Sequence, residues 1–235
     1  MIKTIKRNIR FLLGIKNDTD YYSQGGEDAI ASHTFSYVVP TQNGFYIDIG
    51  AYHPYKHSNT YILHKAGWRG MNIDPRPGIK KLFDRYRPND INIEAGIGSE
   101  DKQMTYYILE EDQKMNSFSK ESLEKLGAFE SVKRTIDVPV YTLDSLLKKY
   151  PDIKNIDYLN IDAEGFEMEI LSGLNFEKLK PKVISIEQND VFTFADVFES
   201  SVCNFLSHKG FTPYAKNIIL KNISTIFYIQ NDCCQ

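Results

Sequence analysis

Acidic side chains recur in this sequence directly after segments that have the composition of buried strands, at Asp48, Asp74, Asp162, Glu164 and Glu187. In an open parallel sheet, ligands bind beyond the carboxyl ends of the strands, so residues in these positions can share one ligand. Carboxylates there can accept hydrogen bonds from a ribose diol, pair with an ammonium group, hold Mg²⁺ or accept a proton during catalysis. The pattern therefore predicts a binding or catalytic site at one edge of a sheet.

The loop after the first of these segments restricts the kind of ligand. The segment GFYIDIG at residues 44–50 ends in Gly50, which is followed by Ala51 and the bulky residues 52–55. A loop that approaches the pyrophosphate of a dinucleotide needs the spacing G-x-G-x-x-G, because its glycines let the backbone come close to the phosphates. This turn has a single glycine, so it favours a ligand without phosphate. S-adenosylmethionine is such a ligand, with a ribose, an adenine, a sulfonium and an amino-acid end.

Further residues are candidates for contacts with such a cofactor. Asp74 ends the expected second strand, where a carboxylate can accept two hydrogen bonds from a ribose diol. The alternative is that Asp74 caps the next helix near Gly78. Asp48 is expected to meet the ammonium group of the cofactor. The polar residues at the start of the following helix are expected to meet its carboxylate, and they are Ser58, Asn59 and Thr60.

The acids after the fourth and fifth expected strands could carry out the chemistry of methyl transfer. An alcohol is a poor nucleophile at neutral pH, so we expect a base or a metal ion to help remove its proton. Asp162, Glu164 and Glu187 end neighbouring strands, and Asp162 and Glu187 could hold Mg²⁺, which takes oxygen ligands. Alternatively, one of these carboxylates or His53 acts directly as the base. A third interpretation is structural: Asp162 binds the cofactor amine and Glu164 caps the next helix.

Strand-like and helix-like segments alternate after residue 20, and they must position these residues. Strands are expected at 44–50, 69–75, 90–97, 155–162 and 181–188, with two more close to the C-terminus. Helices are expected at 58–68, 78–86, 142–150, 165–174 and 195–210. This alternation predicts an α/β fold with a mostly parallel sheet and helices on both faces. The last two strands have a short connection, which suits an antiparallel hairpin at one edge.

Composition limits the class of protein. The chain has 235 residues, of which 42% are hydrophobic and 25% are charged, which suits a single α/β domain. Its net charge is −3, so we expect no nucleic-acid partner. The sequence has no apolar stretch of about 18 residues, so no membrane-spanning helix is expected. The three cysteines show neither a disulfide framework nor metal-ligand spacing, which is typical of a cytoplasmic protein.

Two parts of the chain are expected to differ from the alternating core. Residues 1–20 are basic and place isoleucine and leucine at helical spacing, which predicts an amphipathic helix. That helix could pack on the domain, on a second copy of the chain in a homo-oligomer, or on a membrane surface. Residues 21–235 then form one domain, with an irregular insertion at about 98–140. The insertion could build a substrate site or be a solvated excursion.

Three segments of the sequence resemble the signature blocks of FkbM-type S-adenosylmethionine-dependent methyltransferases, in that family's order and spacing. They are SQGGED at 23–28, FYIDIGAYHPYKHSNTYILHKAGWRGMNIDP at 45–75 and YLNIDAEGFEMEILSGL at 158–174. The resemblance extends over about residues 22–230. It implies the Rossmann-like class I methyltransferase fold, in which the last strand of a seven-stranded sheet is antiparallel. It also implies that Gln24 and Glu27 close over the cofactor or the substrate.

The resemblance further implies methyl transfer to oxygen, often to a sugar hydroxyl in glycan or natural-product pathways. We therefore expect a small-molecule acceptor, such as a nucleotide-linked sugar or a glycan. Two other functions stay open on the sequence alone. A nicotinamide-dependent oxidoreductase would need the phosphate-approach glycines, which this loop lacks. A binding module that has lost turnover would not need the full set of carboxylates.

Overall fold

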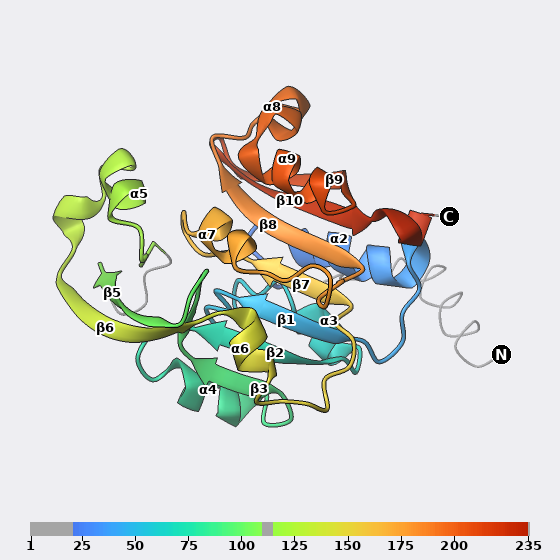
Figure 1. Cartoon of the computed structure of the whole chain (residues 1–235), viewed down its shortest axis with the longest axis horizontal. Coiled ribbons are helices and arrows are strands. Elements are labelled where there is room, and N and C mark those ends of the chain that lie inside the picture. Colours follow the sequence, from blue (N-terminus) through green and yellow to red (C-terminus); the bar gives the residue numbers. More distant parts are fainter. Residues whose placement is uncertain (1–20, 110–114, 235) are drawn as a thin grey trace, which may run out of the picture.

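A seven-stranded sheet forms the centre of the protein (Figure 1). The computed structural model describes residues 21–109 and 115–234, so the helix expected at 1–20 lies outside the described residues. The strands lie in the order β3-β2-β1-β7-β8-β10-β9. Their bounds are β1 Phe45–Ile49, β2 Arg69–Asp74, β3 Ile91–Glu94, β7 Tyr158–Ile161, β8 Val183–Asn189, β9 Phe211–Leu220 and β10 Ile223–Gln230.

The direction of the strands confirms the predicted fold. Neighbouring strands from β3 through to β8 are parallel, whereas the last strand, β10, is antiparallel to both β8 and β9. The final two strands form the expected hairpin, and β10 lies inside the sheet while β9 forms its edge. The sheet is therefore the Rossmann-like sheet of class I methyltransferases.

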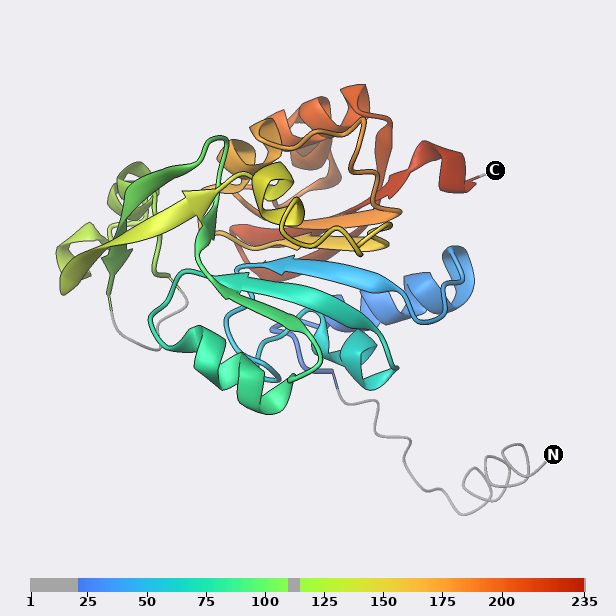
Figure 2. The same cartoon turned by 60° about the horizontal axis from the view of Figure 1, so that its bottom comes forward.

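Helices cover both faces of this sheet (Figure 2). On one face lie α2 Glu27–His33 with the π-helix Thr34–Val38 that continues it, α3 Tyr61–Lys65 and α4 Ile79–Tyr86. On the other face lie α6 Leu143–Leu147, α7 Glu167–Ser172, α8 Phe194–Glu199 and α9 Ser201–His208. A short 3₁₀ helix, Asn231–Cys234, follows β10. Among the helices in the described ranges, none is long and apolar enough to cross a membrane.

The central strands are buried on both faces, because successive side chains of a strand point in opposite directions. Ile47 of β1 and Leu159 of β7 pack into the core formed with α6, α7 and α9. Tyr46 and Tyr158, one residue earlier in each strand, pack into the opposite core, which contains Trp68. Packing on both faces fixes the position of each strand in the sheet. It therefore also fixes the positions of the residues that follow each strand.

The predicted insertion forms a second, smaller sheet. Its strands are β4 Gly96–Ile97, β5 Lys102–Ile108 and β6 Arg134–Tyr141, in the order β4-β6-β5. Between β5 and β6 lie α5 Lys120–Lys125 and the 3₁₀ helix Phe129–Ser131. This sheet projects beyond the carboxyl ends of the parallel strands, on the left in Figures 1 and 2. The insertion therefore lies where a ligand of the main sheet would bind.

Two expected elements are interrupted in the structure. The strand expected at 90–97 ends at Glu94, and the chain then leaves the main sheet so that Gly96 and Ile97 pair with β6. The helix expected at 195–210 breaks at Ser200, whose backbone is extended and whose hydroxyl accepts a hydrogen bond from Cys203 N at 3.1 Å. Ser200 therefore ends one helix and caps the next, which apolar spacing alone does not reveal.

Candidate active site

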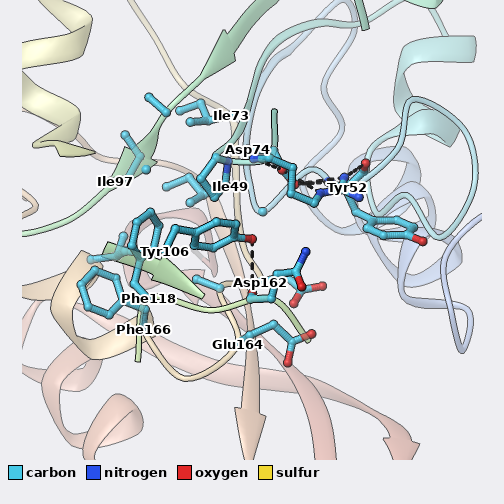
Figure 3. A pocket seen from close by; sticks show the side chains of 18 of the residues that line it. Ile49, Tyr52, Ile73, Asp74, Ile97, Tyr106, Phe118, Asp162, Glu164 and Phe166 are labelled. Atoms are coloured by element: carbon cyan, nitrogen blue, oxygen red, sulfur yellow. Dashed lines mark hydrogen bonds and ion pairs between the residues drawn. The ribbon is translucent and has the colours of Figure 1, made fainter. Parts of the chain in front are cut away.

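A cavity lies between the carboxyl ends of β1, β2 and β7 and the inserted sheet (Figure 3). It holds about 670 Å³ of empty space, counted with the solvent at its mouth. Apolar side chains gather on one side of it, namely Ile49, Ile73, Ile97, Tyr106, Phe118 and Phe166. The polar lining residues include Gln24, Asp74, Asn116, Asp162 and Glu164. The cavity thus combines an apolar slot with several polar groups.

Gly50 lies where β1 and β7 come closest beside this cavity. Its φ is +79°, and a Cβ atom at this position would overlap the carbonyl oxygen of Asp162. The backbone amides of Gly50 and Ala51 both donate to Ile73 O, at 2.9 and 3.1 Å. The glycine is therefore required by a tight turn against a neighbouring strand, and this requirement needs no phosphate.

Asp74 ends β2 at the cavity, as expected, and its carboxylate is held by the neighbouring loop. Tyr52 N donates to Asp74 Oδ2 at 2.9 Å, and Arg76 N and Nε donate to Oδ1 at 2.9 Å each. The Arg76 guanidinium also lies 4.4 Å from the centre of the Tyr52 ring. Glu94, and not Asp74, accepts from Gly78 N at the start of α4, so the alternative capping role of Asp74 is wrong.

The structure brings Asp162, Glu164 and Glu187 together, as the sequence predicts. Carboxylate oxygens of the three residues lie within 4.8 Å of one another. Asp162 and Glu164 follow β7, and Glu187 lies in β8, which pairs in parallel with β7. Burial raises the pKa of Asp162 well above its usual value, and the negative charge of Glu187 raises it further. The cluster is therefore a candidate proton acceptor or cation site at the edge of the cavity, which Asp162 and Glu164 line.

The segment at 23–28 also reaches this region. Gln24 lines the cavity, and the buried Glu27 begins α2 and accepts a hydrogen bond from Gly25 N at 2.7 Å. The negative charge of Glu27 is one of those that raise the pKa of Asp162, so the two carboxylates act on one another. The first residues of α2 thus lie beside the carboxylate cluster, and closure of Gln24 and Glu27 over the cofactor or the substrate stays a prediction.

One family model matches most of the chain. It describes the methyltransferase FkbM domain, and it matches residues 48–213. The chain belongs to the FkbM methyltransferase family. The matched range contains the end of β1 and the whole of β2, β7 and β8, whose carboxyl ends carry the cavity and the carboxylate cluster. No protein among curated sequences matches the chain.

Solved structures with a similar outline are methyltransferases. A TehB-like SAM-dependent methyltransferase from Corynebacterium glutamicum is 11% identical, covers 97% of this chain and 97% of its own, and has a TM-score of 0.44. The 1,6-didemethyltoxoflavin-N1-methyltransferase of Burkholderia thailandensis is 10% identical over 97% of this chain and 86% of its own, with a TM-score of 0.49. The family assignment rests on the domain match and not on these structures.

In this FkbM domain, four residues expected to contact the cofactor lie in a buried network. Thr60 Oγ1 donates to Asp48 Oδ2 at 2.6 Å, and Asn160 Nδ2 donates to Asp48 Oδ1 at 2.9 Å. Asn59 Nδ2 donates to the side-chain oxygen of Asn160 at 3.3 Å. Asp48, Ser58, Asn59 and Thr60 are all buried, and none of them lines the cavity. This geometry supports the loop that follows β1, and direct contact of these residues with the cofactor stays a prediction.

Arg87 organises this network, and sequence reasoning missed it. The side chain is fully buried and donates to acceptors from four separate segments of the FkbM domain. They are Pro54 O at 2.8 Å, Ser58 Oγ at 2.8 Å, Thr60 Oγ1 at 2.9 Å, Tyr46 OH at 3.1 Å and Asn72 Oδ1 at 3.1 Å. Arginine at the end of a charged helix is usually exposed, so the sequence carries no signal for this role. Arg87 holds the loop at 50–60 against the sheet.

His53 does not have the position of a general base. Its Nδ1 accepts hydrogen bonds from Tyr55 N at 3.3 Å and Lys56 N at 3.1 Å, and the residue is absent from the cavity lining. Partial burial, together with the positive charges of Lys56 and Arg76, lowers its pKa to about 4. The imidazole therefore fixes the turn of its own loop, and it lies outside the cavity lining that contains Asp162 and Glu164.

Proposed function

We propose that this FkbM domain transfers the methyl group of S-adenosylmethionine to a hydroxyl oxygen of a small acceptor, with a sugar hydroxyl as the expected target. The observation that carries the proposal is the carboxylate cluster, in which Asp162 and Glu164 line the cavity and Glu187 lies within 4.8 Å of both. The family supplies the methyltransferase activity, and the carboxylates supply the group that an alcohol acceptor needs.

The lining of the cavity suits the separate parts of the cofactor. Tyr106, Phe118 and Phe166 form an apolar slot of the kind that receives a flat adenine ring. Asp74 lies at the end of β2, where a carboxylate accepts hydrogen bonds from ribose hydroxyls. Because Arg76 contacts both Asp74 oxygens, we expect Arg76 to turn aside when the ribose binds. The sulfonium then lies toward Asp162.

The reaction is an in-line substitution at the methyl carbon. The acceptor oxygen forms the new bond to carbon, the carbon–sulfur bond breaks, and its electron pair stays on sulfur. The hydroxyl proton passes to a carboxylate, for which Asp162 is our candidate because its raised pKa makes it a better base. The oxygen ligands of Asp162 and Glu187 also fit Mg²⁺, which when bound would lower the pKa of the hydroxyl.

Cofactor choice gives the first test. We expect isothermal titration calorimetry to show binding of S-adenosylmethionine and of S-adenosylhomocysteine, and no binding of NAD at the same concentrations. The reason is that Gly50 N and Ala51 N both donate to Ile73 O, and the turn has no further glycine that would let the backbone approach a pyrophosphate. Binding of NAD without binding of either sulfur compound would refute the proposed function.

Asp74 gives a second test. The Asp74→Ala change removes a carboxylate that would make two hydrogen bonds to the ribose, each worth roughly 1.5–3 kcal/mol, so Kd should rise by about tenfold to several hundredfold. Asp84→Ala is the matched control, because Asp84 is an exposed carboxylate on α4. Equal affinity of the two variants for S-adenosylhomocysteine would remove Asp74 from the cofactor site.

A further inference from the structure

A large groove adjoins the cofactor cavity on the side of β8. It holds about 1590 Å³ of empty space, counted with the solvent to which it opens. Its lining comes from α5 of the insertion, from the loop after β7, from the end of β8 and from α8 and α9. Figure 1 shows α5 and α8 standing on either side of the tip of β8. A small molecule such as a sugar fits between them.

The groove meets the cofactor cavity at the carboxylate cluster. Asp162 and Glu164 line the cavity, whereas Glu187 lines the groove, and their oxygens lie within 4.8 Å of one another. The loop after β7 forms the boundary, and Gly165 packs so closely on Ser122 of α5 that a Cβ atom would overlap it. An acceptor in the groove would therefore reach the cluster from the side opposite to the cofactor.

The charge of the groove is strongly negative. In the part of the lining that the structure describes, a single ammonium group is present, that of Lys125, which is paired with Asp190 at 2.5 Å. Backbone hydrogen bonds from Thr193 and Phe192 lower the pKa of Asp196, so that carboxylate stays ionised. The carboxylates of the lining are those of Glu121, Glu167, Glu187, Asp190, Asp196 and Glu199. A phosphate group placed here would be repelled by several like charges at once.

Exposed aromatic side chains lie close in the sequence to residues that line the groove. Phe192 follows the lining residue Val191, and Phe194 begins α8 shortly before the lining residue Asp196. Phe192 and Phe194 are 52% and 66% exposed. Large exposed apolar side chains beside a groove are typical of a binding surface. Aromatic faces pack on the C–H groups of a ring, while carboxylates accept hydrogen bonds from its hydroxyl or amino groups.

We infer that this groove is the acceptor site and that it takes an acceptor rich in hydroxyl or amino groups and free of phosphate and carboxylate. The inference rests on the proposed function, because it places the acceptor opposite the cofactor in the same site. It also narrows the expected acceptor class, since a nucleotide-linked sugar would bring a diphosphate into a groove lined by carboxylates. A glycan end or a free sugar meets the condition.

A matched set of sugars tests whether the groove discriminates against negatively charged ligands. The full chain is saturated with S-adenosylhomocysteine, and Kd is measured by calorimetry or ligand-observed NMR for methyl hexosides, methyl amino-hexosides, hexose 1-phosphates and uridine diphosphate hexoses. We expect the neutral or amino member of each set to bind at least about tenfold more tightly than the phosphorylated members. Equal or tighter binding of the phosphorylated members overturns the inference, as does binding of no sugar. Failure of S-adenosylhomocysteine to bind would instead count against the proposed function.

Reversing the charge of two lining residues tests whether the groove itself causes the discrimination against phosphate. In the double variant Glu121→Lys, Glu199→Lys, two exposed carboxylates of the lining become cationic, so affinity for hexose 1-phosphate should rise by about threefold or more. The affinity for S-adenosylhomocysteine should stay the same. Glu177→Lys is the control, since Glu177 is exposed but lies outside the groove. An equal gain in the control would show a general field effect and overturn the inference.

Discussion

The Asp162→Asn variant should lose methyl transfer by a factor of about 10² or more while it binds S-adenosylmethionine normally. The amide keeps the shape of the side chain and cannot accept the hydroxyl proton or contribute a charge to a cation site. Turnover is measured with radiolabelled S-adenosylmethionine at saturating cofactor. Asp152→Asn is the control, because Asp152 is an exposed carboxylate away from the cavity. Full activity of Asp162→Asn would return Asp162 to a structural role.

The same variant should be more stable than the wild type at neutral pH. Burial and Glu187 raise the pKa of Asp162 in the folded state, so the folded protein holds the proton more tightly than the unfolded chain does. Stability is therefore lost as pH rises from the ordinary pKa of an aspartate through the raised value, and it stays lower above that range. Removing the charge should recover roughly 0.5–2 kcal/mol, or a Tm increase of about 1–8 °C in differential scanning calorimetry.

The pH profile and a chelator then separate the two versions of the chemistry. If Asp162 is the direct base, the rate should fall as pH falls through its raised pKa, and a chelator should have no effect. If Asp162 and Glu187 hold Mg²⁺, a chelator should abolish turnover, and added Mg²⁺ should restore it. Mg²⁺ should then also raise the Tm of the wild type and leave that of Asp162→Asn unchanged, which is a readout independent of activity.

The Arg87→Lys variant should be strongly destabilised, although it keeps the charge. The three guanidinium nitrogens donate to five fixed acceptors, including the backbone oxygen of Pro54 and the side-chain oxygen of Asn72. A lysine ammonium cannot reach all of them, so buried acceptors lose their partners. We expect a loss of roughly 3 kcal/mol in the free energy of unfolding, measured by urea denaturation, and weaker binding of S-adenosylhomocysteine.

Arg85→Lys is the matched control for this experiment. Arg85 lies two residues earlier at the end of α4, and its side chain is exposed. The change there should stay within about 0.5 kcal/mol of the wild type. Similar midpoints for the two variants would show that the hydrogen bonds of Arg87 contribute little to the stability of the FkbM domain.

The fold and the edge that carries the site follow from local patterns in the sequence. Alternating strand-like and helix-like segments predict the parallel sheet, because a parallel pair needs a long crossover. The acids that follow these segments predict the site, since all parallel strands end at the same edge. For this reason the expected acids lie at the cavity or the groove, and they are Asp74, Asp162, Glu164 and Glu187.

The roles of individual residues depended on contacts between segments that are far apart in the sequence. Gly50 is required because Asp162 lies against it, and Arg87 is buried because it reaches the loop at 50–60. Asp48 and His53 have residue types suited to binding and catalysis, yet the structure places both outside the cavity lining. The physical reason is that hydrogen-bond partners, burial and the pKa values that follow from them are properties of the packed arrangement. Strand order and side-chain packing decide them, and residue type and spacing alone do not.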